Sequence, residues 1–450
     1  MKKYLIYKNS GLEWTGDVPS HWNISRLDTL CELKKDTISK EELNGQSVFH
    51  YSIPVIQETG DGAIENGDTI DSNKFLVHGN EVLFSKLNPR KETIVITKIR
   101  SKLKHICSSE FLVIKPIKIN LDFLYFLLRS YSVKERICSK VQSATKSHQR
   151  AIPEDIIKMW HAIPPIEEQI EISNFLKRKL IQIEDIVFKK QNLINLLREE
   201  RLSLINKAVT KGIVPKIKMK DSTIKWIGEM PANWRSLKLK YCLSKITGGG
   251  TPATENPIYW NGEIPWVSAK DMKVEKNIED SIDKITYEAI SNSSTNLLKP
   301  GCVLIVVRSG ILKHSLPLAI NTVALTINQD LKALEVNDFI SNEFLFWQLK
   351  GRSFEILSTC NKMGATVDSI EMTDLLNFKL CIPDKAEQKK IVDHIEKETS
   401  RIDLAIEKML NEIDLLDEYK TSLINDVISG QVYVLEKEVM QDKNNELVNE

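Results

Sequence analysis

Apolar residues recur on alternating steps of four and three along two long stretches of the chain. Between Pro165 and Gly212 no proline or glycine interrupts the first stretch, and the second repeats its pattern 219 residues later. This heptad spacing is typical of coiled-coil helices, and helices of about 45 residues would each be roughly 65–70 Å long. The seam residues are Ile183, Val187, Ile194, Leu197, Leu204 and Ala208, then Ile402, Ile406, Met409, Ile413, Leu416, Leu423 and Val427.

Charged residues interrupt both seams. Arg201 and Lys420 occupy the same heptad position, and Lys190 aligns with Met409. Because the two seams share one register, the pattern predicts an intramolecular antiparallel coiled coil whose register the charged positions fix at some cost in stability. The alternative is two separate surface helices, each packed on its own domain.

The stretches that precede the helices are also related. Residues 12–27 read LEWTGDVPSHWNISRL and residues 224–239 read IKWIGEMPANWRSLKL, with both tryptophans, the glycine and the proline in common. Further matches are Ala-Thr at 144 and 365, Ile-Pro at 163 and 382, Glu-Gln at 168 and 387, and Ser-Leu-Ile-Asn at 203 and 422. Each half ends on a glycine, Gly212 or Gly430. The chain is therefore a duplicated globular domain plus helix.

Residues 35–143 and 246–364, between the matching blocks, share little beyond length. Both predict mixed domains with more strand than helix, with strands over Val82–Phe84, Thr93–Thr97, Glu110–Ile114, Val303–Val307 and Thr322–Ile327. Each also contains an aromatic-rich stretch, Leu121–Leu128 and Phe339–Trp347, that predicts a core helix. A common framework with diverged inserts suggests two different binding domains.

The sequence thus predicts an α+β (mixed α/β) protein of two tandem domains with pseudo-two-fold symmetry. We expect the first globular domain over residues 1–160 and its helix over 163–212. The second domain then covers residues 221–380, its helix 383–430, and a polar tail 431–450.

Composition narrows the class of protein. The 450 residues carry a net charge of only +1, but seven Lys/Arg face one acid between Lys86 and Lys104, and six face one between Arg129 and Arg150. Such basic stretches suit a phosphate-facing surface, or equally solvated loops. No apolar run is long enough for a membrane span or a signal peptide. We therefore expect a cytoplasmic protein, whose seven dispersed cysteines form no disulfide framework or zinc site.

Enzyme motifs are incomplete. Residues 256–259 (Asn-Pro-Ile-Tyr) lack the second proline of the amino-methyltransferase box, and no glycine-rich cofactor loop accompanies them. The glycine spacing of residues 62–67 is that of a phosphate-binding loop, but Asp68 stands where such a loop needs lysine. The histidines show no metal-ligand spacing. We expect no catalytic residue, metal or cofactor.

The ordered motifs resemble those of type I restriction–modification specificity subunits. Residues 248–272 (GGGTPATENPIYWNGEIPWVSAKDM), 303–312 (VLIVVRSGIL) and 327–333 (INQDLKA) look like parts of their target-recognition domains, as does 81–90 (EVLFSKLNPR) in the first half. The paired W-x-G-x-x-P-x-x-W openings and I-P-x-x-x-E-Q helix entries complete the likeness, which covers residues 12–430.

The resemblance implies a subunit without chemistry of its own. Each recognition domain would read one half of an asymmetric, bipartite site in double-stranded DNA, with the coiled coil as the spacer. Half-sites read from one face of the duplex lie about one helical turn, ~34–36 Å, apart. The helices would also dock two methyltransferase subunits and, through them, two restriction–translocation subunits.

Base reading requires Arg or Lys for guanine, Asn or Gln for adenine, and Ser or Thr for adaptable bonds, on loops beside strands. A glycine run also permits close backbone approach to phosphate. In the first domain the candidates are Lys86, Asn88, Arg90, Lys91, Thr145, Lys146, His148 and Arg150. In the second they are Gly248, Gly249, Gly250, Thr251, Ser268, Lys270, Arg308, Ser309 and Lys313. Asn328 and Gln329 could also read bases, and the alternative is that they support the core of the domain.

Two other functions fit the same sequence. A scaffold or adaptor would bind proteins through the inserts and dimerise between chains through its helices. A DNA-reading subunit that serves a methyltransferase alone would look the same as one that also serves a nuclease.

Overall fold

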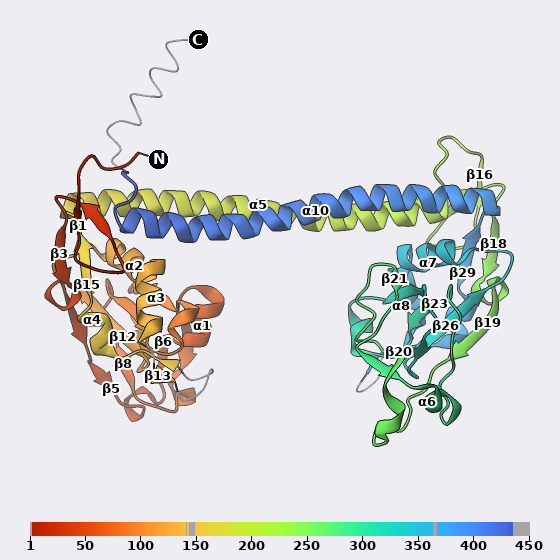
Figure 1. Cartoon of the computed structure of the whole chain (residues 1–450), viewed down its shortest axis with the longest axis horizontal. Coiled ribbons are helices and arrows are strands. Elements are labelled where there is room, and N and C mark those ends of the chain that lie inside the picture. Colours follow the sequence, from red (N-terminus) through yellow and green to blue (C-terminus); the bar gives the residue numbers. More distant parts are fainter. Residues whose placement is uncertain (1, 141, 144–148, 363–366, 435–450) are drawn as a thin grey trace, which may run out of the picture. The chain divides into compact units, whose positions relative to one another are not determined.

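The computed structural model describes residues 2–140, 142–143, 149–362 and 367–434. The chain divides into two compact units. Unit 1 consists of Met1–Lys190 with Leu410–Glu450, and unit 2 consists of Gln191–Met409. Each unit therefore contains one globular domain and parts of both long helices (Figure 1).

Unit 1 is built around an antiparallel four-stranded sheet in the order β10-β9-β12-β4. A five-stranded sheet, β5-β8-β11-β6-β7, lies beside it in the chain's diverged segment. The strands of the first sheet are β4 (Cys31–Lys34), β9 (Val82–Ser85), β10 (Ile94–Ile96) and β12 (Phe111–Pro116). Those of the second are β5 (Thr37–Ile38), β6 (Ser47–Tyr51), β7 (Ala63–Asn66), β8 (Lys74–Leu76) and β11 (Lys104–Ser108). Around them lie β1 (Tyr7–Asn9), β2 (Asp17–Pro19), β3 (Asn23–Arg26), β13 (Gln142–Ser143), β14 (Gln149–Arg150), β15 (Trp160–Ile163), α1 (Ile53–Thr59), α2 (Leu121–Arg129), α3 (Tyr131–Ser139) and α4 (Pro153–Ile157).

The alternation of side chains along β9 explains why this strand is buried on both faces. Val82 and Phe84 pack into the main core of unit 1 with α2 and the long helices, whereas Leu83 packs into a smaller core with Phe49 and Tyr51. The four-stranded sheet therefore separates the helical layer from the five-stranded sheet.

Unit 2 repeats the four-stranded sheet with equivalent strands in the order β24-β23-β26-β19 and adds β21 at the edge. A separate three-stranded sheet has the order β22-β20-β25. The strands are β19 (Leu243–Gly248), β20 (Trp260–Val267), β21 (Asn277–Ile278), β22 (Asp283–Ile285), β23 (Val303–Val306), β24 (Leu318–Asn321), β25 (Thr326–Ile327) and β26 (Leu331–Val336). The remaining elements are β16 (Met219–Asp221), β17 (Glu229–Pro231), β18 (Arg235–Lys238), β27 (Asn361–Lys362), β28 (Ser369–Ile370), β29 (Lys379–Ile382), α6 (Tyr287–Ser291), α7 (Asn342–Gly351), α8 (Ser353–Cys360) and α9 (Met372–Asn377). The two halves thus share a core sheet, most of whose strands lie in the inserts, and the insert sequences do not reveal it.

Two expected elements of unit 2 were misplaced. The strand predicted over 322–327 is wrong in its first part: the chain bends there, and the strand that pairs with β23 is β24 instead. The buried Asn321 side chain ends β24 by donating to the carbonyls of Lys299 and Val323, both at 2.8 Å. The aromatic helix begins at Asn342 rather than at Phe339, because the Ser341 hydroxyl caps it by accepting from the Phe344 N–H.

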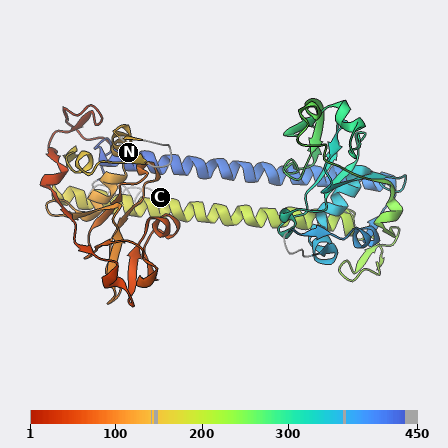
Figure 2. The ribbon, with the colours of Figure 1, turned by 90° about the horizontal axis from the view of Figure 1, so that it is seen from below.

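The long helices are α5 (Ile166–Lys211) and α10 (Lys385–Ile428), and Figure 2 shows segments of both in each unit. They run antiparallel. In unit 1, Lys190 binds Glu412 and Lys420 binds Glu184. In unit 2, Arg201 binds Asp403 at 2.8 Å. The charged seam residues therefore pair with carboxylates across the helices.

The repeated glycine and tryptophan belong to one packing motif. Gly212 and Gly430 end the two helices with φ of +76° and +74°. A side chain at Gly430 would lie 2.4 Å from Pro19 and 3.2 Å from Trp22, and Gly212 approaches Pro231 and Trp234 in the same way. The end of α10 thus packs on the opening motif of the first half, whereas α5 packs on that of the second.

The repeated Glu-Gln pair connects each long helix to its domain. Glu168 accepts from the Trp22 indole at 3.1 Å and from the Tyr4 hydroxyl at 2.5 Å. Gln169 accepts from the backbone N–H of Asn120, the residue that caps α2, and Gln388 does the same for Ser341, which caps α7. The sequence shows this pair only as a repeated block at each helix entry, whereas the structure gives its residues tertiary contacts.

The first described residues of unit 1 pack against its last described residues. The Tyr433 N–H donates to the Lys2 carbonyl at 2.9 Å, and the Tyr4 and Tyr433 rings lie 5.0 Å apart. Val434 is buried in the main core. Residues 432–434, which the predicted polar tail of residues 431–450 includes, therefore pack on the core of unit 1.

Candidate nucleic-acid interface

Four strands of unit 2 end along one edge of the domain. β19, β20, β23 and β25 end at Gly248, Val267, Val306 and Ile327. Backbone hydrogen bonds tie the following loops together, from Gly250 N–H to the Ile327 carbonyl at 3.0 Å and from Arg308 N–H to the Asp330 carbonyl at 3.2 Å. We call residues 248–251, 268–270, 308–313 and 328–330 the unit 2 edge. All nine candidates of the second domain lie on it.

The side chains of the unit 2 edge are cationic and polar. Lys270, Arg308 and Lys313 are exposed, and none of them forms an ion pair with a residue that the structure describes. Thr251 donates to the Gln329 amide oxygen at 2.6 Å, so two adaptable polar groups lie beside these cations. The edge therefore offers guanidinium, ammonium, hydroxyl and amide groups toward solvent.

Three candidates of this edge also have structural roles. A side chain at Gly249 would lie 1.9 Å from the Ile327 carbonyl oxygen, and one at Gly250 would lie 2.3 Å from the Ser294 hydroxyl. The close backbone approach that these glycines permit is thus to their own domain. Ser268 is buried and donates to Asp271 at 2.9 Å.

The equivalent edge of unit 1 follows β9. The N–H of Asn88 donates to the Gln149 carbonyl at 2.8 Å, and that of Ala151 donates to the Lys86 carbonyl at 2.9 Å. The Arg150 guanidinium binds Glu110 at 2.6 Å, and the Lys86 ammonium donates to the Ser109 carbonyl. We call residues 86–91 and 149–151 the unit 1 edge.

The unit 1 edge brings five of the eight candidates of the first domain together. Arg90 and Lys91 are exposed on it, and Asn88 adopts a left-handed backbone with φ of 49°. Thr145, Lys146 and His148 lie outside the described residues. The isolated bridges Leu87–Arg150 and Arg308–Ser369 place the loops after β9 and β23 in matching environments. One scaffold therefore presents different side chains in the two units.

Sequence reasoning missed a basic cleft of ≈ 920 Å³ in unit 1. Lys98, Arg100, Arg129 and Lys177 line it together with Lys91. Lys98 and Arg100 fall in the first basic stretch and Arg129 begins the second, and these two stretches were the available signals. Arg129 and Lys177 come from helices remote in sequence, and no local pattern connects them with the loop.

The buried thiols of unit 2 are not reactive groups. Burial raises the pKa of Cys242, Cys302 and Cys381 to about 11, so all three stay protonated near neutral pH. Among the described residues no group of three or more His, Cys, Asp or Glu is placed to hold a metal ion. In the same part of the chain, no helix combines the length and apolarity needed to span a bilayer.

A family model described as "Type I restriction modification DNA specificity domain" matches residues 19–196 and 231–415. The chain belongs to this family. The two matched segments correspond to the two halves of the internal repeat, and each contains one of the edges described above.

Specificity subunits are also the relatives found by sequence. The chain is 37% identical over 174 residues to the EcoR124I/EcoR124II specificity subunit of Escherichia coli, a match covering 38% of the chain and less than half, 43%, of that subunit. It is 22% identical over 429 residues to the MjaVIII specificity subunit of Methanocaldococcus jannaschii, covering 93% of the chain and 94% of that protein.

Two solved structures share the fold. One, described as the structural basis of complex assembly and conformational transition of the type I R-M system, matches 92% of this chain and 99% of its own with a TM-score of 0.73 and 16% identity. The HsdS subunit of Thermoanaerobacter tengcongensis matches 92% of this chain and 98% of its own with a TM-score of 0.54 and 18% identity. The tandem two-domain architecture is therefore that of this family.

Proposed function

We propose that this chain is the DNA-reading subunit of a type I restriction–modification complex. Each unit reads one half of an asymmetric, bipartite site in double-stranded DNA. The observation that carries this proposal is the pair of edges: a common four-stranded sheet supports both, and they present different exposed polar side chains in a chain of the specificity family. Because the two edges present different side chains on equivalent sheets, the two half-sites should have different base sequences.

The chemistry of each edge suits base reading. The exposed guanidinium of Arg308 is the group that pairs best with guanine, and the amide of Gln329 is suited to adenine. Lysines such as Lys270 and Lys91 suit phosphate contacts, which orient the duplex without carrying sequence information. Specificity would come from the first kind of contact and much of the affinity from the second.

In this proposal partner subunits carry out methylation and ATP-dependent cleavage, and this chain catalyses neither reaction. The relatives that support this are named specificity subunits. Two methyltransferase subunits would dock on the long helices and bring two restriction subunits with them. The cell compartment of such a complex is the cytoplasm.

Equivalent surfaces in the two units support two docking sites. Tyr131 at the start of α3 is 53% exposed beside the last turns of α10, where Asn425 accepts from the Ser132 N–H at 3.1 Å. Phe354 near the start of α8 is 81% exposed beside the last turns of α5, where Asn206 donates to the Gly351 carbonyl at 3.0 Å. The repeated Ser-Leu-Ile-Asn blocks supply both asparagines.

Genome-wide mapping of methylated bases, with and without this gene, tests the proposed function. We expect one asymmetric, two-part methylated sequence to disappear on deletion and to return on complementation. An unchanged methylation pattern, with the purified chain bound to a protein rather than to DNA, would instead support the adaptor function. Loss of restriction together with methylation would distinguish a complete system from a methyltransferase alone.

A further inference from the structure

The basic cleft of unit 1 has an excess of cations. Its carboxylates are already paired: Asp61 with Arg100 at 2.5 Å, Asp122 with Lys177 at 2.5 Å, and Glu92 with Lys134 at 2.5 Å. The remaining cations that line the cleft are Lys91, Lys98 and Arg129. None of these three forms an ion pair with a described residue; Arg129 donates instead to the Tyr125 hydroxyl at 2.7 Å. The cleft thus presents three unneutralised positive charges.

The cleft also contains the free edge of β10, an outer strand of its sheet. Ser85 N–H donates to the Thr93 carbonyl, and Thr97 N–H donates to the Glu81 carbonyl. In an antiparallel pair, hydrogen-bonded residues alternate with residues whose N–H groups point outward. The N–H and C=O groups of Ile94 and Ile96, two residues that line the cleft, therefore point away from β9. The two N–H groups add donors to the cleft, and the three cations without an ion pair to a described residue give it its preference for an anion.

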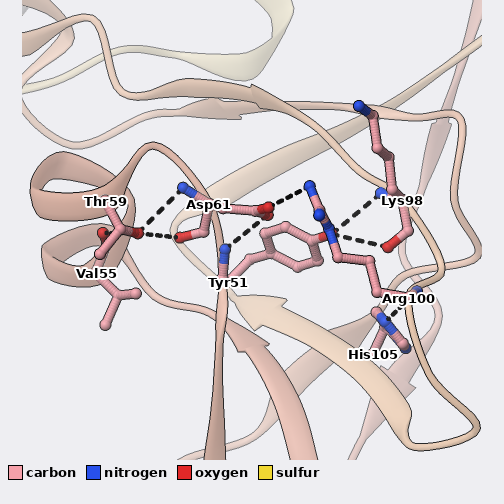
Figure 3. A network of polar contacts seen from close by, with 8 residues as sticks. Tyr51, Val55, Thr59, Asp61, Lys98, Arg100 and His105 are labelled. Carbon is pink, nitrogen blue, oxygen red and sulfur yellow. Dashed lines mark hydrogen bonds and ion pairs between the residues drawn. The ribbon is translucent and has the colours of Figure 1, made fainter.

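A polar network holds Lys98 at this cleft (Figure 3). The buried Tyr51 hydroxyl donates to the Lys98 carbonyl at 3.0 Å and accepts from the Lys98 N–H at 3.1 Å. Two residues further on, Arg100 binds Asp61, and its N–H donates to His105, whose ring stacks on Phe49 at 4.9 Å. The loop backbone is fixed on both sides of Lys98, while the lysine side chain is exposed and has no ion-pair partner among the described residues.

The cleft is continuous with the unit 1 edge. The short turn Pro89–Lys91 carries Lys91 into the cleft, and Asn88, the residue before it, bonds to Gln149 on the edge. Lys91 and Lys98 are exposed and Arg129 is half-buried, so the charges line an open surface rather than an enclosed chamber. Such a surface suits an extended polyanion better than a small one.

The geometry points to a backbone-binding site: Lys91, Lys98 and Arg129 grip the phosphates of duplex DNA beside the bases that the unit 1 edge reads, and Tyr51 positions Lys98. This inference rests on the proposed function and adds the site of sequence-independent contact in the first domain. The contacts neutralise phosphates, so they contribute affinity and salt dependence without base preference.

The test uses the full chain in its methyltransferase complex, with a duplex carrying the mapped site and a scrambled duplex of equal length. Each phosphate contact contributes about 0.9 to the slope of log affinity against log salt. We therefore expect Lys98→Ala combined with Arg129→Gln to lower that slope by about 2 on both duplexes. The ratio of the two affinities should stay at its wild-type value. Tyr51→Phe keeps every charge and should produce a smaller decrease in slope.

Lys102→Ala is the matched control, because Lys102 is exposed in the same basic loop but does not line the cleft. An unchanged slope in the double variant, or a decrease equal to that of Lys102→Ala, would overturn the phosphate site. The phosphate site would also be overturned if the double variant lost binding of labelled inorganic phosphate but kept wild-type binding of the duplex. If the wild-type complex shows no preference for the mapped duplex, the proposed function itself fails, whatever the slopes.

Discussion

Arg308 shows how one residue becomes a candidate base reader. It lies two residues after the end of β23 at Val306, its backbone N–H donates to the Asp330 carbonyl, and its guanidinium is exposed. We expect Arg308→Ala to cost about 1–3 kcal/mol of specific binding and to relax preference at one position of the unit 2 half-site. Competition binding against single-base variants of the site measures this. Arg235→Ala, an exposed arginine on β18, is the control; wild-type preference in Arg308→Ala would remove Arg308 from the site.

His161 is a residue whose chemistry acts on stability instead. It lies on β15 with its ring fully buried and its Nε2 without a hydrogen-bond partner among the described residues, and burial lowers its pKa to about 4. In the unfolded chain the His161 imidazole binds a proton near pH 6.5, whereas in the folded chain it stays neutral down to about pH 4. The contribution of neutral His161 to the free energy of unfolding is therefore fully present above pH 6.5. As the pH falls toward 4, this contribution decreases by roughly 2–3 kcal/mol.

His161→Phe should remove this acid sensitivity from unit 1. Hydrogen exchange of β15 at pH 7 and at pH 5 measures it, with the exposed His314→Gln as the control. Equal acid-induced loss in the His161→Phe variant and in the wild-type protein would show that other groups cause it.

At the scale of elements, the heptad pattern predicted the two long helices, because a periodic seam is a local property of the sequence. Each seam residue named from the pattern is buried or half-buried in the structure. The partners of the charged seam positions were not predictable, since Asp403 and Glu412 are ordinary surface acids by sequence. Strand ends around Asn321 and the start of α7 at Asn342 also depended on side-chain hydrogen bonds that no periodicity reports.

The ion pair between Arg201 and Asp403 tests what a charged seam position contributes. The Arg201 side chain is 12% exposed, but that of Asp403 is 45% exposed, so solvent screens the pair. A double-mutant cycle with alanine at both positions should give a coupling of about 0.5–1 kcal/mol that falls at high salt. The exposed Arg401–Glu398 pair of the same helix is the control. If the coupling energy is no larger than that of the control pair, the Arg201–Asp403 ion pair does not fix the register of the two helices.

At the scale of the whole molecule, duplication predicts that one reader can be exchanged without the other. Replacing residues 35–143 by the segment of another family member should change one half-site and leave the other intact, because the two edges share no residue. Methylation mapping reads the result. The reciprocal exchange of residues 246–364 is the matched experiment, and a change of both half-sites in either chimera contradicts independent reading.

The spacer is the second whole-molecule property. Deleting four residues near Asn195 shortens α5 by about 6 Å and shifts its seam against α10. We expect an altered spacer between the half-sites or loss of assembly, measured by methylation mapping and by co-purification. Asn195→Ala keeps the helix length and should keep the spacer. An unchanged spacer after the deletion would mean that the coiled coil does not set the distance.

The sequence by itself determined the duplication, the two long helices, the aromatic core helices and the family, because each rests on residues close together in the chain or on repeated blocks. Only the tertiary structure decided three further features. The helix after each globular domain packs at its far end on the opening motif of the other half, through Gly212 with Trp234 and Gly430 with Trp22. Two halves whose inserts have no common sequence share one four-stranded sheet. Lys98 and Arg129 meet at one cleft. The physical reason is the same for all three: contacts between remote segments depend on packing and backbone hydrogen bonds, which local periodicity does not record.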